Sequence, residues 1–285
     1  MNVDGLKKLA AEKAVEEISS GMIVGLGTGS TVQFALEKIS ERIKNNELKN
    51  IIGIPSSSKT EKEAIRLEIP ITTLNELYLS EDEKHKKGNG NQKHVLSASE
   101  GSEIRNQKSE SIIHHPSSII HHSSSITHHP LPIFIDLTID GADEFDEQLN
   151  LIKGGGGALL REKILAQASK RLIIITDGSK QSKYLGTKWP VPIEVFKFCF
   201  DLEKKFLESL NAKAEPRKNS DGSNYITDEN NFILDADFGE IKNVKGLADI
   251  LNDRAGIVEH GLFVGLADKI ICAKESGIEI YTRNS

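Results

Sequence analysis

Residues 22–39, MIVGLGTGSTVQFALEKI, join a short apolar run to a glycine-rich turn and then to a helical pattern. The letters MIVGLG have the length and composition of a buried strand, and the apolar positions of residues 31–44 recur at helical spacing. The glycines between them predict a tight turn from strand to helix. This strand, turn and helix together predict an α/β fold.

The same alternation continues along much of the chain. Apolar runs that are buried on both faces are typical of the inner strands of a parallel sheet. Helices that alternate with such strands predict βαβ units and a mostly parallel, Rossmann-like sheet flanked by helices. The expected helices are 4–19, 31–44, 56–68 and 158–169, and the expected strands are 22–27, 50–54, 69–74, 133–139 and 171–177.

A smaller α+β domain is expected after residues 189–195, WPVPIEV, whose two prolines predict a junction. Its expected helices are 200–210 and 245–253, and its short strands lie near 212–217, 224–227 and 231–235. The predicted organisation is an α/β catalytic domain formed by residues 1–79 and 131–192, a small α+β domain at 193–260, and a return to the first domain at 261–285.

Residues 80–130 differ from the rest in composition and contain a repeat of seven residues, IIHHPSS, IIHHSSS and ITHHP. The prolines and the lack of flanking charges argue against a coiled coil. The segment is predicted to be a disordered low-complexity insertion. Paired histidines can ligate zinc or nickel, so a metal site in this segment stays open as the alternative.

Composition narrows the class of protein. The net charge of −6 argues against nucleic acid or a membrane surface as a partner, and a small anionic ligand would need local positive groups. The chain has neither a run long enough to span a membrane nor an N-terminal secretory pattern, which predicts a cytoplasmic protein. The two cysteines, Cys199 and Cys272, are expected to be buried core thiols.

Ligands of parallel sheets bind outside the carboxyl ends of the strands, and the first candidate loop there is GLGTGST, residues 25–31. Its small residues let backbone N–H groups approach an anion at a helix N-terminus. Ser30 replaces the third glycine of the dinucleotide fingerprint, and no Walker lysine follows. A tight turn without a ligand is the alternative.

The second loop, DGADEFD at residues 140–146, groups four carboxylates after a buried strand: Asp140, Asp143, Glu144 and Asp146. Close carboxylates perturb one another's pKa values, which is useful in a catalytic site. A turn with a helix cap explains the pattern equally well. A divalent metal site is a further possibility.

The third loop lies in residues 151–164, LIKGGGGALLREKI, where Lys153 precedes four consecutive glycines. Glu162 follows in the predicted helix and shares a helical face with Leu159 and Ala166. If that face is interior, desolvation raises the pKa of the carboxyl and makes it a better base. The alternative is a surface glutamate flanked by basic neighbours.

The fourth loop is TDGSK, residues 176–180, which presents Lys180 at the same edge of the sheet. The motifs GLGTGST, SSS, DGADE, KGGGGALLREK and DGSK occur in this order along the chain. In this order they resemble the ribose-5-phosphate isomerases of the A type. The resemblance covers nearly the whole chain except the insertion, and it is weakest in the C-terminal third.

That family interconverts ribose 5-phosphate and ribulose 5-phosphate through an enediolate, in the non-oxidative branch of the pentose phosphate pathway, without a metal or redox cofactor. The resemblance implies that Glu162 is the base and that Lys153, Asp140 and Asp143 bind sugar oxygens and assist ring opening. It implies a homodimer or homotetramer as well. The implied substrate-binding residues are Lys7, Thr28, Gly29, Ser30, Thr31, Gly141, Ala142, Gly154, Gly155, Gly156 and Lys180.

The chain departs from the family at Gly157 and Leu160, where alanine and threonine are frequent. Neither change removes an implied catalytic group. Two other functions stay open. One is a regulatory module that binds a sugar phosphate without turnover, which would lack the base. The other is a coenzyme A transferase, which has a related fold and a glutamate nucleophile, and in which Lys153 and the DGAD loop are not expected together.

Overall fold

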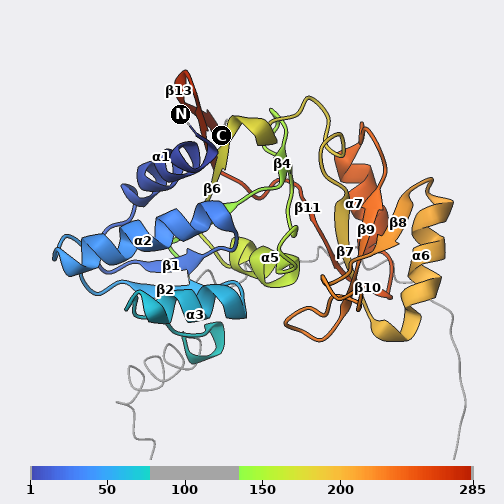
Figure 1. Ribbon diagram of the computed structural model, residues 1–285, viewed down its shortest axis with the longest axis horizontal. Coiled ribbons are helices and arrows are strands. Elements are labelled where there is room, and N and C mark those ends of the chain that lie inside the picture. The colour runs from blue at the N-terminus through green and yellow to red at the C-terminus, as the bar shows by residue number, and fades with distance from the viewer. Residues whose placement is uncertain (1, 78–134, 284–285) are drawn as a thin grey trace, which may run out of the picture.

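The computed structural model describes residues 2–77 and 135–283, and its larger unit is built on a six-stranded sheet (Figure 1). The strand order is β13-β12-β6-β3-β1-β2; neighbouring strands run parallel except β13, which is antiparallel to β12. The strands are β1 (Ile23–Leu26), β2 (Ile52–Pro55), β3 (Leu137–Gly141), β6 (Leu172–Asp177), β12 (Lys269–Lys274) and β13 (Gly277–Thr282). The predicted mostly parallel α/β sheet is confirmed.

Helices cover both faces of this sheet. Apolar residues of α1 (Val3–Val15) and α2 (Ser30–Lys44) share one core cluster with β1, β3, β6 and β12. The helix α3 (Ser58–Arg66) follows β2, and α5 (Leu159–Gln167) lies between the large sheet and the second unit (Figure 1). The helix α5 is therefore placed where residues of both units reach it.

Alternation along β3 and β6 decides which side chains point toward α5. In β6, Ile173 and Ile175 pack with α1 and α2, whereas Ile174 belongs to the core on the opposite face. In β3, Leu137 and Ile139 take the α1/α2 side. Successive side chains of a strand point to opposite faces, so Asp140 is directed to the face that α5 covers.

The second unit is an antiparallel sheet in the order β10-β7-β9-β8, with helices α6 (Phe200–Ser209) and α7 (Val244–Asn252) packed on it. A small third sheet, in the order β11-β5-β4, lies beside it. The remaining elements are β4 (Glu144–Phe145), β5 (Leu151–Ile152), β7 (Val191–Val195), β8 (Lys213–Pro216), β9 (Phe232–Asp237), β10 (Ile257–His260), β11 (Leu262–Phe263) and the 3₁₀ turns η1 (Gly178–Lys180) and η2 (Lys197–Cys199).

The segment WPVPIEV, expected to be a junction, forms β7, an inner strand of the second sheet. Pro192 is tolerated there because its carbonyl accepts a hydrogen bond from the Gly261 N–H, just beyond the end of β10. The missing N–H of Pro192 faces that same side, where the β10 ladder has already ended. Since β7 crosses the expected boundary at residue 192, we propose that the second domain begins at Val191.

Two further expected strands are absent from the described part of the chain. Within 69–74, Ile71 forms a single bridge with Gly53, and near 224–227, Asn224 forms a single bridge with Lys218. Cys272 is buried as expected, whereas Cys199 is partly exposed at the end of η2.

None of the helices in residues 2–77 and 135–283 is long and apolar enough to cross a membrane. The predicted insertion at 80–130, with its histidine pairs, lies outside the described residues.

The two described ends that flank the insertion meet in one apolar cluster, in which Leu77 and Ile135 pack with Ile54 and Leu165. Deletion of residues 82–128 is therefore expected to leave the fold intact and the activity largely intact, because a shorter connection costs less closure entropy. The measurement is thermal unfolding of the purified deletion variant together with an assay of the activity expected from the sequence. A variant that folds but has lost most of its turnover would contradict this prediction.

Candidate active site

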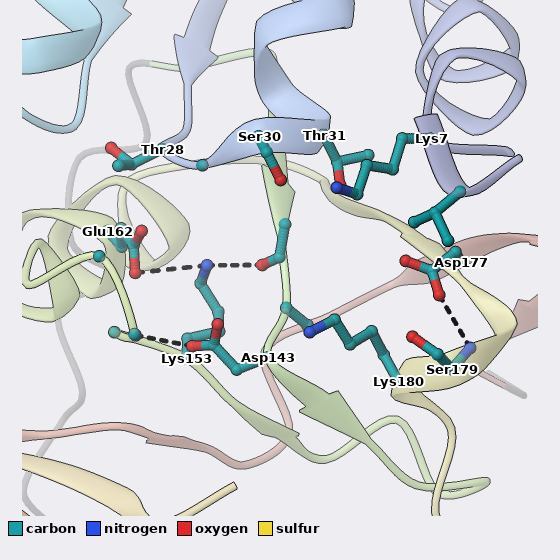
Figure 2. A pocket seen from close by; sticks show the side chains of 17 residues that line it. Lys7, Thr28, Ser30, Thr31, Asp143, Lys153, Glu162, Asp177, Ser179 and Lys180 are labelled. Atoms are coloured by element: carbon teal, nitrogen blue, oxygen red, sulfur yellow. Dashed lines mark hydrogen bonds and ion pairs between the residues drawn. The ribbon is translucent and has the colours of Figure 1, made fainter. Parts of the chain in front are cut away.

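A cleft of about 210 Å³ opens at the carboxyl ends of β1, β3 and β6 (Figure 2). It collects the candidate loops that lie far apart in the sequence. Each of the predicted catalytic and substrate-binding residues except Asp140 lines it. The lining residues are Val3, Lys7, Thr28, Gly29, Ser30, Thr31, Gly141, Ala142, Asp143, Lys153, Gly154, Gly155, Gly156, Glu162, Asp177, Ser179 and Lys180, with Asp140 directly behind them against Lys153.

The ammonium group of Lys153 is at the centre of the site. Its Nζ lies 3.0 Å from Asp140 Oδ2 and 3.3 Å from Glu162 Oε2, and it donates a 2.6 Å hydrogen bond to the Gly141 carbonyl. The three charged side chains are almost fully buried. Burial lowers the pKa of Lys153, but Asp140 and Glu162 outweigh it and raise the pKa above its usual value. Lys153 is therefore a fixed positive charge.

The Asp140 carboxylate is held by the first glycine loop. Its Oδ1 accepts hydrogen bonds from the backbone N–H groups of Thr28 at 3.0 Å and Gly141 at 2.7 Å. A Cβ atom on Gly27 would lie 2.2 Å from Asp140 Oδ1, so only glycine allows the loop to approach this closely. The GLGTGST loop therefore orients a carboxylate of the site.

The Asp143 carboxylate meets the second glycine loop. Its Oδ2 accepts a 2.7 Å hydrogen bond from the Gly155 N–H, and a Cβ on Gly155 would lie 2.6 Å from Asp143 Oδ1. Burial raises the pKa of Asp143, although the Gly155 hydrogen bond and the Lys153 charge oppose the shift. Two glycine loops thus hold two aspartates on either side of one lysine.

Glu162 enters the cleft from the first turn of α5. The predicted interior face is confirmed, since Leu159, Glu162 and Ala166 are buried, and so is Lys163. The contact of Glu162 with Lys153 is an ion pair without hydrogen-bond geometry, so Glu162 Oε2 has no hydrogen-bond donor among the described residues.

The electrostatic surroundings of Glu162 favour its protonated form. Burial is the largest cause and raises the pKa of its carboxyl to about 8. The Lys153 ammonium opposes this rise, whereas Asp140 and Asp143 add to it. The pKa of the Glu162 carboxyl therefore lies close to neutral pH.

Lys7 and Lys180 form the basic side of the cleft, away from Glu162 (Figure 2). Lys7 comes from α1, with its Nζ 3.5 Å from Asp4 Oδ1, and Lys180 comes from η1, with its Nζ 5.2 Å from the centre of the Trp189 ring. The N-terminus of α2 at Ser30 opens onto the same space. Ammonium groups and a helix N-terminus together suit an anion.

Some details differ from the expectations. The hydroxyl of Thr28 lies within 3.1 Å of the hydroxyls of Ser56, Ser57 and Thr60. The Thr28 side chain therefore forms its hydrogen bonds within the protein. Asp177 lines the cleft but was missed in TDGSK, where lysine was the more obvious anion ligand. Asp177 also accepts a hydrogen bond from the Ser179 N–H, as the cap of η1.

The other two carboxylates of DGADEFD do not reach the cleft. Glu144 accepts hydrogen bonds from the backbone N–H groups of Gly186 and Trp189, and Asp146 accepts from Gln148 and Asn150. These two side chains hold loops in place. No three His, Cys, Asp or Glu side chains of the described ranges are grouped as a metal site requires.

Comparison with known proteins shows the family to which this chain is similar. The family model of ribose 5-phosphate isomerase A (phosphoriboisomerase A) matches residues 119–277. A ribose-5-phosphate isomerase A from Desulfatibacillum aliphaticivorans is 44% identical over 275 residues, covering 96% of each chain. One from Synechococcus sp. is 38% identical, covering 98% of this chain and 97% of its own.

Solved structures of the same family are also similar to this chain. Ribose 5-phosphate isomerase from Plasmodium falciparum is 34% identical with a TM-score of 0.74, covering 99% of this chain and all of its own. A D-ribose-5-phosphate isomerase in complex with phospho-erythronic acid is 32% identical with a TM-score of 0.77, with the same coverage. The chain therefore belongs to the ribose-5-phosphate isomerase A family, whose members are aldose–ketose isomerases.

Proposed function

We propose that this chain interconverts D-ribose 5-phosphate and D-ribulose 5-phosphate through an enediolate, with Glu162 as the base that moves the proton. The observation that supports this most is the Glu162 carboxyl itself, which is buried at the cleft beside an ammonium group, with no hydrogen-bond donor to its Oε2 in the part of the chain that the structure describes. The related structure with phospho-erythronic acid contains an anionic sugar acid phosphate. Such a ligand needs the combination of cationic and hydroxyl-binding groups that this cleft offers.

The proton transfer follows from the arrangement of charges. Glu162 takes the proton from C2 of the open-chain aldose, the C–H electron pair forms the C1–C2 double bond, and the carbonyl pair moves onto O1. Protonated Glu162 then returns the proton to C1, while the O2 proton passes to O1 and C2 becomes the carbonyl. The Lys153 ammonium stabilises the negative charge that develops on these oxygens.

The other cleft residues have supporting roles in this proposal. Asp143 binds sugar hydroxyls and assists ring opening, for which a carboxyl with a raised pKa is suited. Asp140, which lies behind the cleft, assists by holding the Lys153 ammonium in place. The phosphate binds between Lys7 and Lys180, next to Ser30 and Thr31. The reaction as proposed uses no metal or redox cofactor. A cytoplasmic location and a homodimeric or homotetrameric assembly stay predictions.

Glu162→Gln is expected to lower kcat by roughly 10²- to 10⁴-fold, the range for loss of a general base, while KM changes little. Glutamine keeps the shape of the side chain but cannot accept the proton. The measurement is steady-state isomerisation of ribose 5-phosphate. Glu229→Gln is the matched control, because Glu229 pairs with Arg161 of the same helix outside the cleft. Comparable turnover of Glu162→Gln and wild type would remove Glu162 from the mechanism.

Glu162→Gln is also expected to be at least as stable as wild type above pH 8. The folded-state pKa of Glu162 is raised from 4.5 to about 8, so the folded state favours the protonated form. The free energy of unfolding of the wild type therefore falls as the pH rises through this range, and the glutamine variant lacks this loss. Urea unfolding at pH 6 and pH 9 tests the sign.

The pH dependence of kcat/KM is expected to rise toward a midpoint near 8 and then level off, because only ionised Glu162 accepts the C2 proton. The residual activity of Asp143→Asn should show a lower midpoint, since the Asp143 charge raises the pKa of Glu162. A wild-type midpoint near 4.5, the ordinary value for glutamate, would contradict the proposal. Binding of ribose 5-phosphate by the wild type without any turnover would instead indicate a regulatory sugar-phosphate-binding module.

A further inference from the structure

Arg217, which directly follows β8 in the second sheet, holds the glycine loop of the cleft from behind. Its Nη1 donates hydrogen bonds to the carbonyl oxygens of Gly154 at 2.7 Å and Gly155 at 3.2 Å. Its Nε and Nη2 donate to the two carboxylate oxygens of Asp235 on β9. Arg217 does not line the cleft. One guanidinium group therefore connects the strand β9 to the glycine loop of the site.

Because the peptide bond is planar, a contact with a carbonyl group of this loop also fixes the direction of the next N–H group. In a trans peptide, the carbonyl of one residue and the N–H of the next point in opposite directions. Fixing the Gly154 carbonyl thus aims the Gly155 N–H, which donates to Asp143 Oδ2 at 2.7 Å. Fixing the Gly155 carbonyl aims the N–H of Gly156, which lines the cleft.

Consecutive glycines supply little conformational restraint of their own, because glycine has more backbone freedom than any other residue. The loop therefore depends on outside contacts for its orientation. Tyr225 adds a weaker one, with its hydroxyl 3.3 Å from the Gly156 carbonyl. Arg217 is the stronger contact, because its planar fork is itself held by two bonds to Asp235.

We propose that Arg217, oriented by Asp235, is a positioning residue of the isomerase reaction. It aims the N–H groups of Gly155 and Gly156 at Asp143 and at the sugar oxygens. This inference rests on the proposed function. Lysine cannot replace Arg217, because a single ammonium lacks the fixed fork that joins two carbonyl groups and a carboxylate.

Arg217→Met and Arg217→Lys test the proposal, with steady-state isomerisation of ribose 5-phosphate as the assay. A loop displaced by about 1 Å can cost on the order of 100-fold in rate, so we expect Arg217→Met to lower kcat roughly 10- to 100-fold. KM should change much less, since Lys7 and Lys180 still hold the phosphate. Compared with Arg217→Met, the Arg217→Lys variant should recover more of the stability than of the kcat.

Arg254→Met is the matched control. Arg254 also forms a two-bonded pair with a carboxylate, Glu203, in the same unit, but it contacts no residue of the glycine loop. The control should lose stability without losing kcat. Equal effects of the Arg217 and Arg254 variants on kcat would overturn the proposal and leave Arg217 with a structural role alone.

Asp235→Asn provides a second test should Arg217→Met fail to fold. It leaves the guanidinium in place but weakens its orientation, so we expect a smaller loss of kcat in the same direction. Unchanged kcat in both Asp235→Asn and Arg217→Lys would overturn the inference. An inactive wild-type protein would instead overturn the proposed function, so the two failures are distinguishable.

Discussion

A buried lysine that is shared by two carboxylates is the interaction on which the site depends. Removing an ammonium group from water is costly, and the cost is offset only when opposite charges and hydrogen-bond acceptors surround it. Lys153 has Asp140, Glu162 and the Gly141 carbonyl within 3.3 Å. Asp140 and Gly141 come from the end of β3 and Glu162 from α5, so the site forms only when the sheet and α5 are in place.

The sheet and the glycine loops each position different groups around Lys153. Strand alternation in β3 sends Asp140 toward α5, and the first turn of α5 returns Glu162 toward the sheet. The loops then approach so closely that Gly27 and Gly155 have no room for a Cβ atom. Backbone N–H groups thus take positions that side chains would otherwise fill. The second sheet completes the site through Arg217, which holds a loop of the first unit.

The sequence was sufficient to predict the elements whose signal is local. Apolar runs predicted the strands β1, β2, β3 and β6 of the large sheet, and helical spacing placed Glu162 on a buried face. The strand β7 was missed because proline normally marks the end of a ladder, and only the end of β10 shows why Pro192 is tolerated. Arg217 could not be identified, because its partners lie more than sixty residues away in Gly154 and Gly155. Such contacts leave no periodic trace in a sequence.

Burial and the charge balance of the cleft together explain the raised pKa of Glu162. Three carboxylates, those of Asp140, Asp143 and Glu162, surround one central ammonium group, so a full set of negative charges exceeds what Lys153 can neutralise. Burial of the Glu162 carboxyl is the largest cause of its pKa of about 8, and the negative charges of Asp140 and Asp143 add to the rise against the opposing charge of Lys153. A base is most effective when its pKa lies near the working pH, because it must both accept and release the same proton. Burial, together with the neighbouring carboxylates, therefore gives Glu162 a pKa that suits the reversible proton transfer proposed for it.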